Sequence, residues 1–254
     1  MDNKLLAWGM RPGVASDTPM ARRSLSLNVI PRHPVPRDIV GQETRPEPLS
    51  VAAAGAILPG MPVRPGEVVF RRSGGRPRVP RLWLFTDDKR LPNPRAAVAR
   101  LPPNAAGVIL RHDADPQRAA LGRDLARICR QRRLLLVVAG DSRLAAALGA
   151  GVHLRGGRWP APIRLRGVIT SSAHSVAELR RAARAGARLV FLSPAFPTAS
   201  HAGAPGLGPL RWAAMGRHAG TSTRLAALGG MNGNSVRRLP ADLCQAVGAI
   251  DALS

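Results

Sequence analysis

The residues best suited to chemistry follow a short apolar run at 189–192. There the chain enters a loop that carries hydroxyls and an imidazole and closes on a glycine. These loop residues are Ser193, Thr198, Ser200, His201 and Gly208. Hydroxyls and backbone N–H groups bind anions such as phosphate, and a helix expected at 209–218 would turn its positive end toward them. An ordinary connecting loop without a ligand is the alternative interpretation.

Glycines follow the next two apolar runs. Gly229 and Gly230 come directly after the first run, while Val247 ends the second and Gly248 follows it. Because glycine has no side chain, its backbone N–H can approach a phosphate closely. A tight turn would use the same glycines without a ligand. Two glycine positions beside the Ser/Thr loop favour a phosphate-binding cup, in which we include Val247.

His174 is the best candidate for moving a proton, because imidazole is the side chain that titrates near neutral pH. It lies in the sequence Ser171-Ser-Ala-His-Ser175, which follows an apolar run. Capping the next helix or bonding a carbonyl is an alternative role for it. His153 lies inside an apolar run, so we expect it to be a structural histidine with a satisfied hydrogen bond.

Eight apolar runs of strand length alternate mostly with helical segments. Strands are expected at 82–85, 107–110, 134–138, 151–154, 165–170, 189–192, 224–228 and 243–247. Helices are expected at 94–101, 116–133, 142–148, 175–185, 209–218 and 234–239, and a loop at 155–165. This alternation predicts an α/β fold, a compact (β/α)8 TIM barrel in which all strands end at one rim. A doubly wound open sheet is the alternative, but no G-x-G-x-x-G follows the first strand.

The first 80 residues differ from the rest in composition. They hold 12 of the 24 prolines and no sustained apolar period, so we expect a Pro/Arg-rich extension, disordered or loosely packed. Met20 and Met61 are alternative starts, which would leave part of this segment untranslated. The barrel domain is expected at 81–254.

Composition argues against several classes of partner. The net charge is +23, almost all of the basic residues are arginine, tyrosine is absent and aromatics are 3%. Because the arginines are dispersed and no stacking platform is visible, we expect a small-molecule ligand and no nucleic acid. No apolar run approaches the roughly 18 residues of a membrane span, so no membrane partner is expected. Two cysteines, Cys129 and Cys244, form no disulfide framework, which suits a cytoplasmic protein; a homo-oligomer remains open.

Seven short motifs, in chain order, resemble those of the thiamine phosphate synthase/TenI family. The first four are Leu82-Trp-Leu-Phe-Thr-Asp87, Leu110-Arg111, Gly151-Val-His-Leu154 and Ser172-Ala-His-Ser175. The others are Ser193-Pro-Ala-Phe-Pro-Thr-Ala-Ser-His201, Leu228-Gly-Gly-Met231 and Ala246-Val-Gly-Ala-Ile250. The resemblance implies a (β/α)8 barrel in thiamine biosynthesis. In this family the synthase joins a hydroxymethylpyrimidine diphosphate to a thiazole phosphate using Mg²⁺, whereas TenI-type members aromatise the thiazole phosphate or lack a known activity.

Departures from the family pattern fall mainly on the metal side of the expected site. Asp113 stands where the family has the lysine of L-R-x-K, and Ala139-Gly140-Asp141 stands for N-D-R. The family's G-Q-x-D is Arg155-Gly-Gly-Arg158, and the lysine of T-x-T-K is His201. Mg²⁺ prefers oxygen ligands, which arginine does not supply. The thiazole-phosphate half of the pattern is retained.

The leading hypothesis is a TenI-like protein that binds a thiazole phosphate and isomerises it as a tautomerase. His174 would carry the proton and Ser172 would orient the substrate. The alternative is a divergent synthase, in which Arg111 contacts the pyrimidine diphosphate and Asp141 helps the diphosphate to hold Mg²⁺. No other metal ligand or cofactor is expected. A second alternative is a regulator that binds a phosphate ligand without catalysis.

Overall fold

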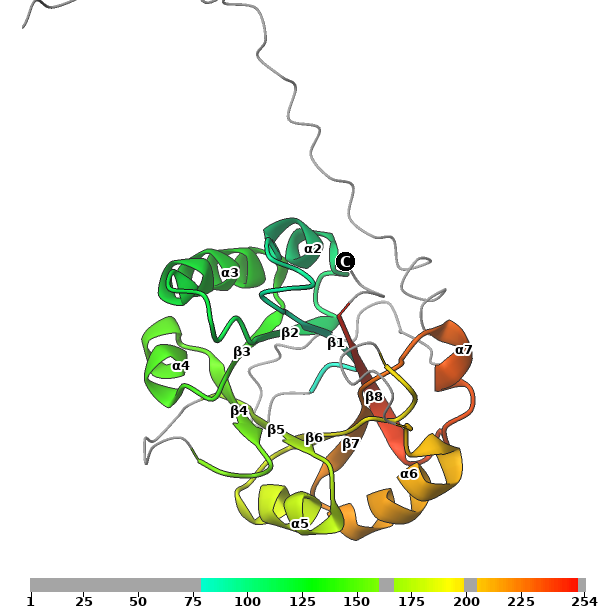
Figure 1. Ribbon diagram of the computed structural model, residues 1–254. Coiled ribbons are helices and arrows are strands. Elements are labelled where there is room, and N and C mark those ends of the chain that lie inside the picture. The colour runs from blue at the N-terminus through cyan, green and yellow to red at the C-terminus, as the bar shows by residue number, and fades with distance from the viewer. Residues whose placement is uncertain (1–78, 160–166, 199–204, 251–254) are drawn as a thin grey trace, which may run out of the picture. The chain divides into compact units, whose positions relative to one another are not determined.

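Eight parallel strands close into a barrel, each hydrogen-bonded to its neighbours in chain order and the last to the first (Figure 1). The computed structural model describes residues 79–159, 167–198 and 205–250. The strands are β1 (Leu82–Phe85), β2 (Ala106–Leu110), β3 (Leu135–Ala139), β4 (Gly151–Arg155), β5 (Ile169–Ala173), β6 (Leu189–Leu192), β7 (Arg224–Ala227) and β8 (Cys244–Ala249). The predicted TIM barrel is confirmed.

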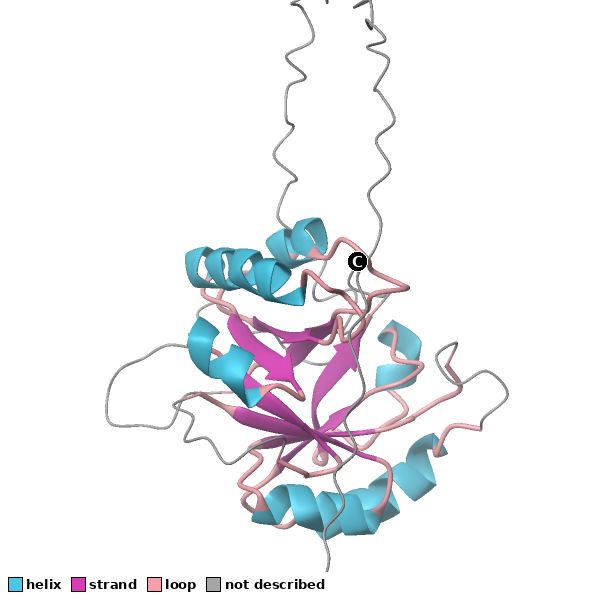
Figure 2. Ribbon diagram, turned by 60° about the vertical axis from the view of Figure 1, so that its left-hand side comes forward, coloured by secondary structure: helices cyan, strands magenta, loops and turns pink. Residues whose placement is uncertain are grey.

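Helices surround the barrel on the outside (Figures 1 and 2). They are α2 (Arg95–Arg100), α3 (Arg118–Arg132), α4 (Ser142–Leu148), α5 (Val176–Arg184), α6 (Gly208–Gly216), the 3-10 helix η2 (Arg217–Ala219) and α7 (Gly233–Val236). Within the described ranges no helix is both long and apolar enough to span a membrane. The extension expected at 1–80 falls almost wholly outside the described residues.

Side chains alternate along each strand between the barrel interior and the helices. In β1, Trp83 and Phe85 belong to the interior cluster, whereas Leu82 and Leu84 belong to the cluster beneath the helices. Val79 joins the interior cluster and is 5% exposed, before the first strand begins. The amino-terminal end of the barrel is therefore filled by apolar side chains.

Two strands differ from their predicted bounds in a way that matters for the site. The fifth strand was expected at 165–170 but lies at Ile169–Ala173, so Ser171 and Ser172 are strand residues. The eighth extends through Gly248 to Ala249. Buried hydroxyls explain the first difference, because Ser171 Oγ donates to the Leu154 carbonyl at 3.1 Å and accepts from the Gly157 N–H at 3.0 Å.

Helix starts differ in how they are capped. The Asp141 carboxylate accepts from the Leu144 N–H at the start of α4. At α2 the cap position belongs to Pro94, and no side chain bonds the helix end. Ser175 caps α5 through its hydroxyl, which leaves the neighbouring His174 side chain available for another role.

Candidate functional site

A cavity of about 750 Å³ lies at the carboxyl ends of the strands. Every strand, or the loop that follows it, contributes to its lining. Of the residues predicted for the site, eight line this cavity: Arg111, Ser172, His174, Ser193, Thr198, Gly229, Gly230 and Gly248. The structure thus brings together residues that are up to 137 positions apart, from Arg111 to Gly248.

The other predicted residues lie elsewhere or outside the described ranges. Gly208 starts α6, and its N–H donates to the Ala195 carbonyl at 2.9 Å. Val247 is 3% exposed in the cluster beneath the helices. Ser200 and His201 fall outside the described residues, so their expected roles stay predictions.

Aromatic rings and a histidine form the deep part of the site. Phe85 packs edge to face against both Phe191 and His153, with centroids 4.8 and 5.6 Å away. His153 Nδ1 lies 2.8 Å from Thr170 Oγ1. Burial, together with the smaller effect of the charges of Arg111 and Arg155, lowers the pKa of His153 to about 3. His153 is therefore a neutral, hydrogen-bonded structural histidine, although it also borders the cavity.

The loop after β7 presents backbone donors to the cavity. Gly229 and Gly230 have positive φ angles of 88° and 64°. The Leu228 and Gly229 carbonyls accept from the N–H groups of Ala195 and Phe196, which ties this loop to the loop after β6. No hydrogen bond joins the N–H of Gly229 or Gly230 to another described residue. Two N–H groups are therefore available to an anion.

Gly248 has a steric reason for being glycine. A Cβ atom there would lie 2.6 Å from the Phe85 ring and 3.1 Å from the Phe191 ring. Gly248 is inside β8, and the rings of Phe85 and Phe191 occupy the space that a side chain at this position would need. Its position at the cavity agrees with the prediction, but close packing explains the residue type without a ligand.

His174 has a defined proton arrangement. Its Nδ1 lies 2.9 Å from the Ser193 carbonyl oxygen, which only accepts, so Nδ1 carries the proton. Its backbone N–H donates to Glu178 Oε2 at 2.7 Å. In the neutral ring, Nε2 then holds a lone pair, and no hydrogen bond joins it to a described residue. The side chain can thus act as a base toward a ligand in the cavity.

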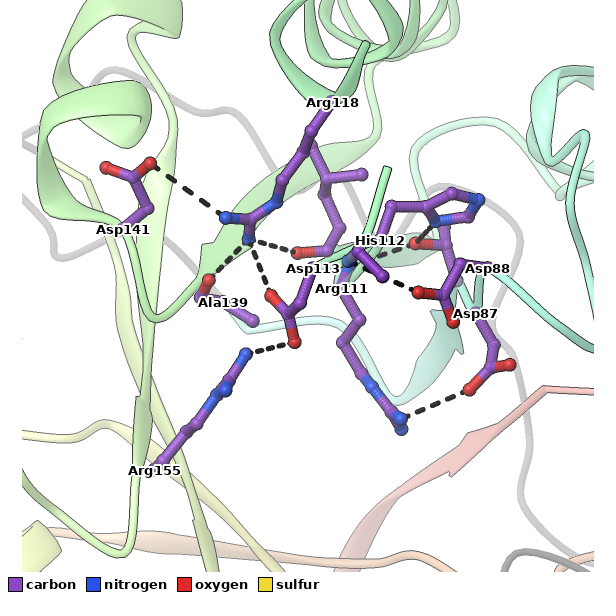
Figure 3. Close-up of polar contacts among 12 residues, drawn as sticks. Asp87, Asp88, Arg111, His112, Asp113, Arg118, Ala139, Asp141 and Arg155 are labelled. Atoms are coloured by element: carbon purple, nitrogen blue, oxygen red, sulfur yellow. Dashed lines mark hydrogen bonds and ion pairs between the residues drawn. The ribbon is translucent and has the colours of Figure 1, made fainter. Parts of the chain in front are cut away.

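The opposite side of the cavity carries arginines paired with carboxylates (Figure 3). Arg111 Nη2 lies 3.1 Å from Asp87 Oδ2. Asp113 contacts Arg155 through one oxygen and lies 3.3 Å from Arg118 through the other. Burial alone would raise the pKa of Asp87, but backbone N–H donors of Arg90 and Lys89 and the charge of Arg111 outweigh it and lower the pKa.

Arg118, which pairs with Asp113, also contacts Ala139 at the end of β3 and Asp141 just after it. Its Nη2 donates to the Ala139 carbonyl at 2.5 Å, and its Nη1 lies 3.9 Å from Asp141 Oδ2. Asp141 also caps α4 with its other oxygen. The carboxylate predicted as a possible metal ligand is therefore engaged by a helix end and by a guanidinium.

The side chains present do not fit a magnesium ion. In the described part of the chain, no group of three or more His, Cys, Asp or Glu is placed to hold a metal. Three of the acidic residues on this side, Asp87, Asp113 and Asp141, each face an arginine, whereas Asp88 accepts from the Ala114 N–H at 3.3 Å. A divalent cation prefers several oxygen ligands, whereas a guanidinium beside each carboxylate repels it.

Sequence reasoning missed several lining residues, of which Arg155 is the most informative. Phe85, Arg90, Asn232 and Ile250 also line the cavity. Arg155 follows His153 by two positions on β4, so the alternation of the strand places both on the same face. Arg155 could have been found from the sequence by continuing the alternation of side chains past the last apolar residue of each strand.

Comparisons with known proteins agree with this geometry. A family model described as TMP-TENI, thiamine monophosphate synthase, matches residues 83–253. The thiamine-phosphate synthase of Geobacillus thermodenitrificans (strain NG80-2) is 32% identical over an alignment of 151 residues; the match covers 54% of this chain and 65% of that relative's length.

A solved structure shares the fold. The thiamine phosphate pyrophosphorylase from Pyrococcus furiosus has a TM-score of 0.54 and 22% identity, covering 68% of this chain and 86% of its own. The family match covers most of the chain and includes all of the barrel strands except Leu82, the first residue of β1. The chain belongs to the thiamine monophosphate synthase/TenI family.

Proposed function

We propose that this protein acts in thiamine biosynthesis by binding a thiazole phosphate in the cavity and moving a proton on its ring. The observation that carries the proposal is the arrangement of His174. Its Nδ1 proton is held by the Ser193 carbonyl at 2.9 Å, so Nε2 is the basic nitrogen. The same cavity is lined by Gly229 and Gly230, whose N–H groups bond no other described residue.

The phosphate would bind at the glycine side of the cavity. The N–H groups of Gly229 and Gly230 supply two hydrogen bonds, and Thr198 and Ser193 lie in the facing loop after β6. Hydrogen bonds from N–H groups to an anion are stronger than those between neutral groups, because the acceptor is charged. Such contacts fix one end of the ligand and leave its ring to be positioned deeper in the cavity.

The thiazole ring would then lie between Ser172 and His174. Nε2 of His174 removes a proton from one ring atom and returns it at another position, which converts one tautomer into the other. No atom is gained or lost, and no redox partner is required. Ser172 contributes a hydroxyl for orienting the ring, because it follows Thr170 by two positions on β5 and lines the same cavity.

A second candidate is a divergent synthase, which two observations favour. The curated relative at 32% identity is a thiamine-phosphate synthase. Arg111 and Arg155 also offer cationic groups to a diphosphate on the side opposite the glycines. A synthase would bind the pyrimidine diphosphate beside Arg111 and Arg155 and the thiazole phosphate beside Gly229 and Gly230.

Turnover assays on the purified full chain separate these functions. Tautomer conversion that persists in a chelator supports the proposed tautomerase. Formation of thiamine phosphate from the two substrates supports the synthase. Binding of the thiazole phosphate without either product would contradict both and leave a non-catalytic binding protein. His218→Asn is a matched control for His174→Asn, because His218 is an exposed histidine in η2 that does not line the cavity.

A further inference from the structure

The charged residues around the cavity are gathered on one side. Among the described residues that line it, Arg90, Arg111 and Arg155 are cationic and Asp113 is the only carboxylate. All four lie on β4 or in the loops after β1 and β2. In the closed barrel, β7, which the glycine loop follows, is three strands away from β2 and from β4 and two strands away from β1 (Figure 1). The cavity therefore has two separate places where an anion is favoured.

Arg155 is oriented by a chain of ion pairs. Its Nη2 contacts Asp113, which is held by Arg118 at 3.3 Å, and Arg118 is fixed to the Ala139 carbonyl at 2.5 Å (Figure 3). The Arg155 side chain is nevertheless 56% exposed. Because a guanidinium has five N–H donors and Asp113 uses one nitrogen, the remaining donors can reach a ligand.

The guanidinium of Arg155 occupies a space left by Gly140. A Cβ atom at Gly140 would lie 3.3 Å from the Cζ, Nε and Nη2 atoms of Arg155. A longer side chain at this position, a carboxylate included, would compete with the guanidinium for the same space. Gly140 stands where the family resemblance places the acidic residue of N-D-R. The guanidinium of Arg155 thus places a positive charge where the family resemblance expects an acidic side chain.

We propose that Arg155, together with Arg111, binds the diphosphate group of a second ligand directly, without a divalent cation. Guanidinium groups match phosphate oxygens in geometry and stay charged at all physiological pH values. The positive charges of the two guanidinium groups take the place of the positive charge that a metal ion would bring to the diphosphate. The proposal rests on the second candidate function, the synthase, only for the class of ligand, an organic diphosphate that enters beside the thiazole phosphate.

Calorimetric titration of the full chain with inorganic pyrophosphate tests this inference. We expect binding in the presence of a chelator and no gain in affinity when Mg²⁺ replaces the chelator. Arg155→Gln should weaken binding at least tenfold, about 1.4 kcal/mol. Arg158→Gln is the matched control: it removes the same charge three residues away, from an exposed side chain that does not line the cavity, and should leave binding unchanged.

Three results would overturn the inference. The first is pyrophosphate binding that requires Mg²⁺. The second is an equal loss of pyrophosphate affinity in Arg155→Gln and Arg158→Gln. The third is a loss of pyrophosphate affinity in Gly229→Asp but not in Arg155→Gln. The last result would place pyrophosphate on the glycine side. Thiazole phosphate binding by Arg155→Gln is measured in parallel and should persist. A result that contradicts the proposed tautomerase activity therefore does not contradict pyrophosphate binding by the arginines, and a result against pyrophosphate binding does not contradict the tautomerase activity.

Discussion

At the scale of single residues, two histidines that line the same cavity differ in burial and in hydrogen bonding. His153 is 3% exposed and bonds Thr170, so it stays neutral beside the arginines. His174 is exposed at the cavity, and its Nδ1 is engaged by a backbone carbonyl. Its place inside an apolar run predicted the structural role of His153, whereas the role of His174, which follows such a run, stays a prediction. The hydrogen bond that sets the reactive nitrogen required the structure.

Stability should depend on pH through His153. Its pKa is lowered from 6.5 to about 3 in the folded chain, so between these values the unfolded chain binds more protons. The contribution of His153 is fully present above pH 6.5 and declines as pH falls, by up to about 1.4 kcal/mol per pH unit. Urea unfolding of the wild type and His153→Gln at several pH values measures it. The stability difference between the two proteins should change with pH below 6.5, and parallel curves would contradict the prediction.

Phosphate binding should depend on Gly229. Gly229→Asp places a negative charge beside the two free N–H groups, so affinity for the thiazole phosphate should fall at least tenfold, about 1.4 kcal/mol. Gly229→Asn is the control for size and for the positive φ of 88°, since asparagine is nearly isosteric with aspartate but neutral. Calorimetry should show a smaller loss for Asn than for Asp. Unchanged affinity in a folded Asp variant would place the phosphate elsewhere.

At the scale of elements, strand order and type could be predicted from the apolar runs, but some strand ends could not. The fifth strand was misplaced because Ser171 and Ser172 are polar, and only the structure shows that Ser171 is satisfied inside the sheet. Arg155 was missed as a site residue because it looks like the start of a loop. In each case the strand continues past its last apolar residue, which hydrophobicity alone does not reveal.

Packing of β8 against β1 should make Gly248→Ala destabilising. The added methyl would lie 2.6 Å from the Phe85 ring, so we expect a loss of about 1–3 kcal/mol in free energy of unfolding. Phe85→Leu removes the ring and should relieve the clash. In denaturant unfolding, the double variant should lose less than the sum of the single variants, by more than about 0.5 kcal/mol. Additive losses would show that the Cβ at 248 is accommodated without moving Phe85.

At the scale of the whole molecule, the barrel and its family were predictable because seven motifs occur in order over one continuous region. The family match begins at residue 83, and the described structure begins at Val79. Val79 and Pro80 are already part of the barrel: the Val79 carbonyl lies 3.4 Å from Arg224 Nη1, and Pro80 accepts from the Trp83 indole at 2.8 Å.

We propose that residues 1–78 are dispensable for folding. A chain that starts at Val79 keeps the contacts of Val79 and Pro80 with the barrel. Thermal unfolding of this chain and of the full chain should give the same melting temperature. A chain that starts at Leu82 serves as a comparison and should be less stable, because it lacks the buried Val79. A drop of more than about 4 °C for the first truncation, roughly 1 kcal/mol or more, would show that the preceding segment packs on the barrel.

The central claim is that His174 moves a proton on a thiazole phosphate, and hydrogen exchange tests it most directly. The full chain is incubated in D2O with chelator and the non-aromatic tautomer of the thiazole phosphate, and the product is analysed by NMR. The wild type and His218→Asn should place deuterium in the product at the position that receives the proton. His174→Asn should bind the substrate with similar affinity but react about 10²–10⁴-fold more slowly. Equal rates for all three proteins, or substrate binding by the wild type without conversion, would contradict the account.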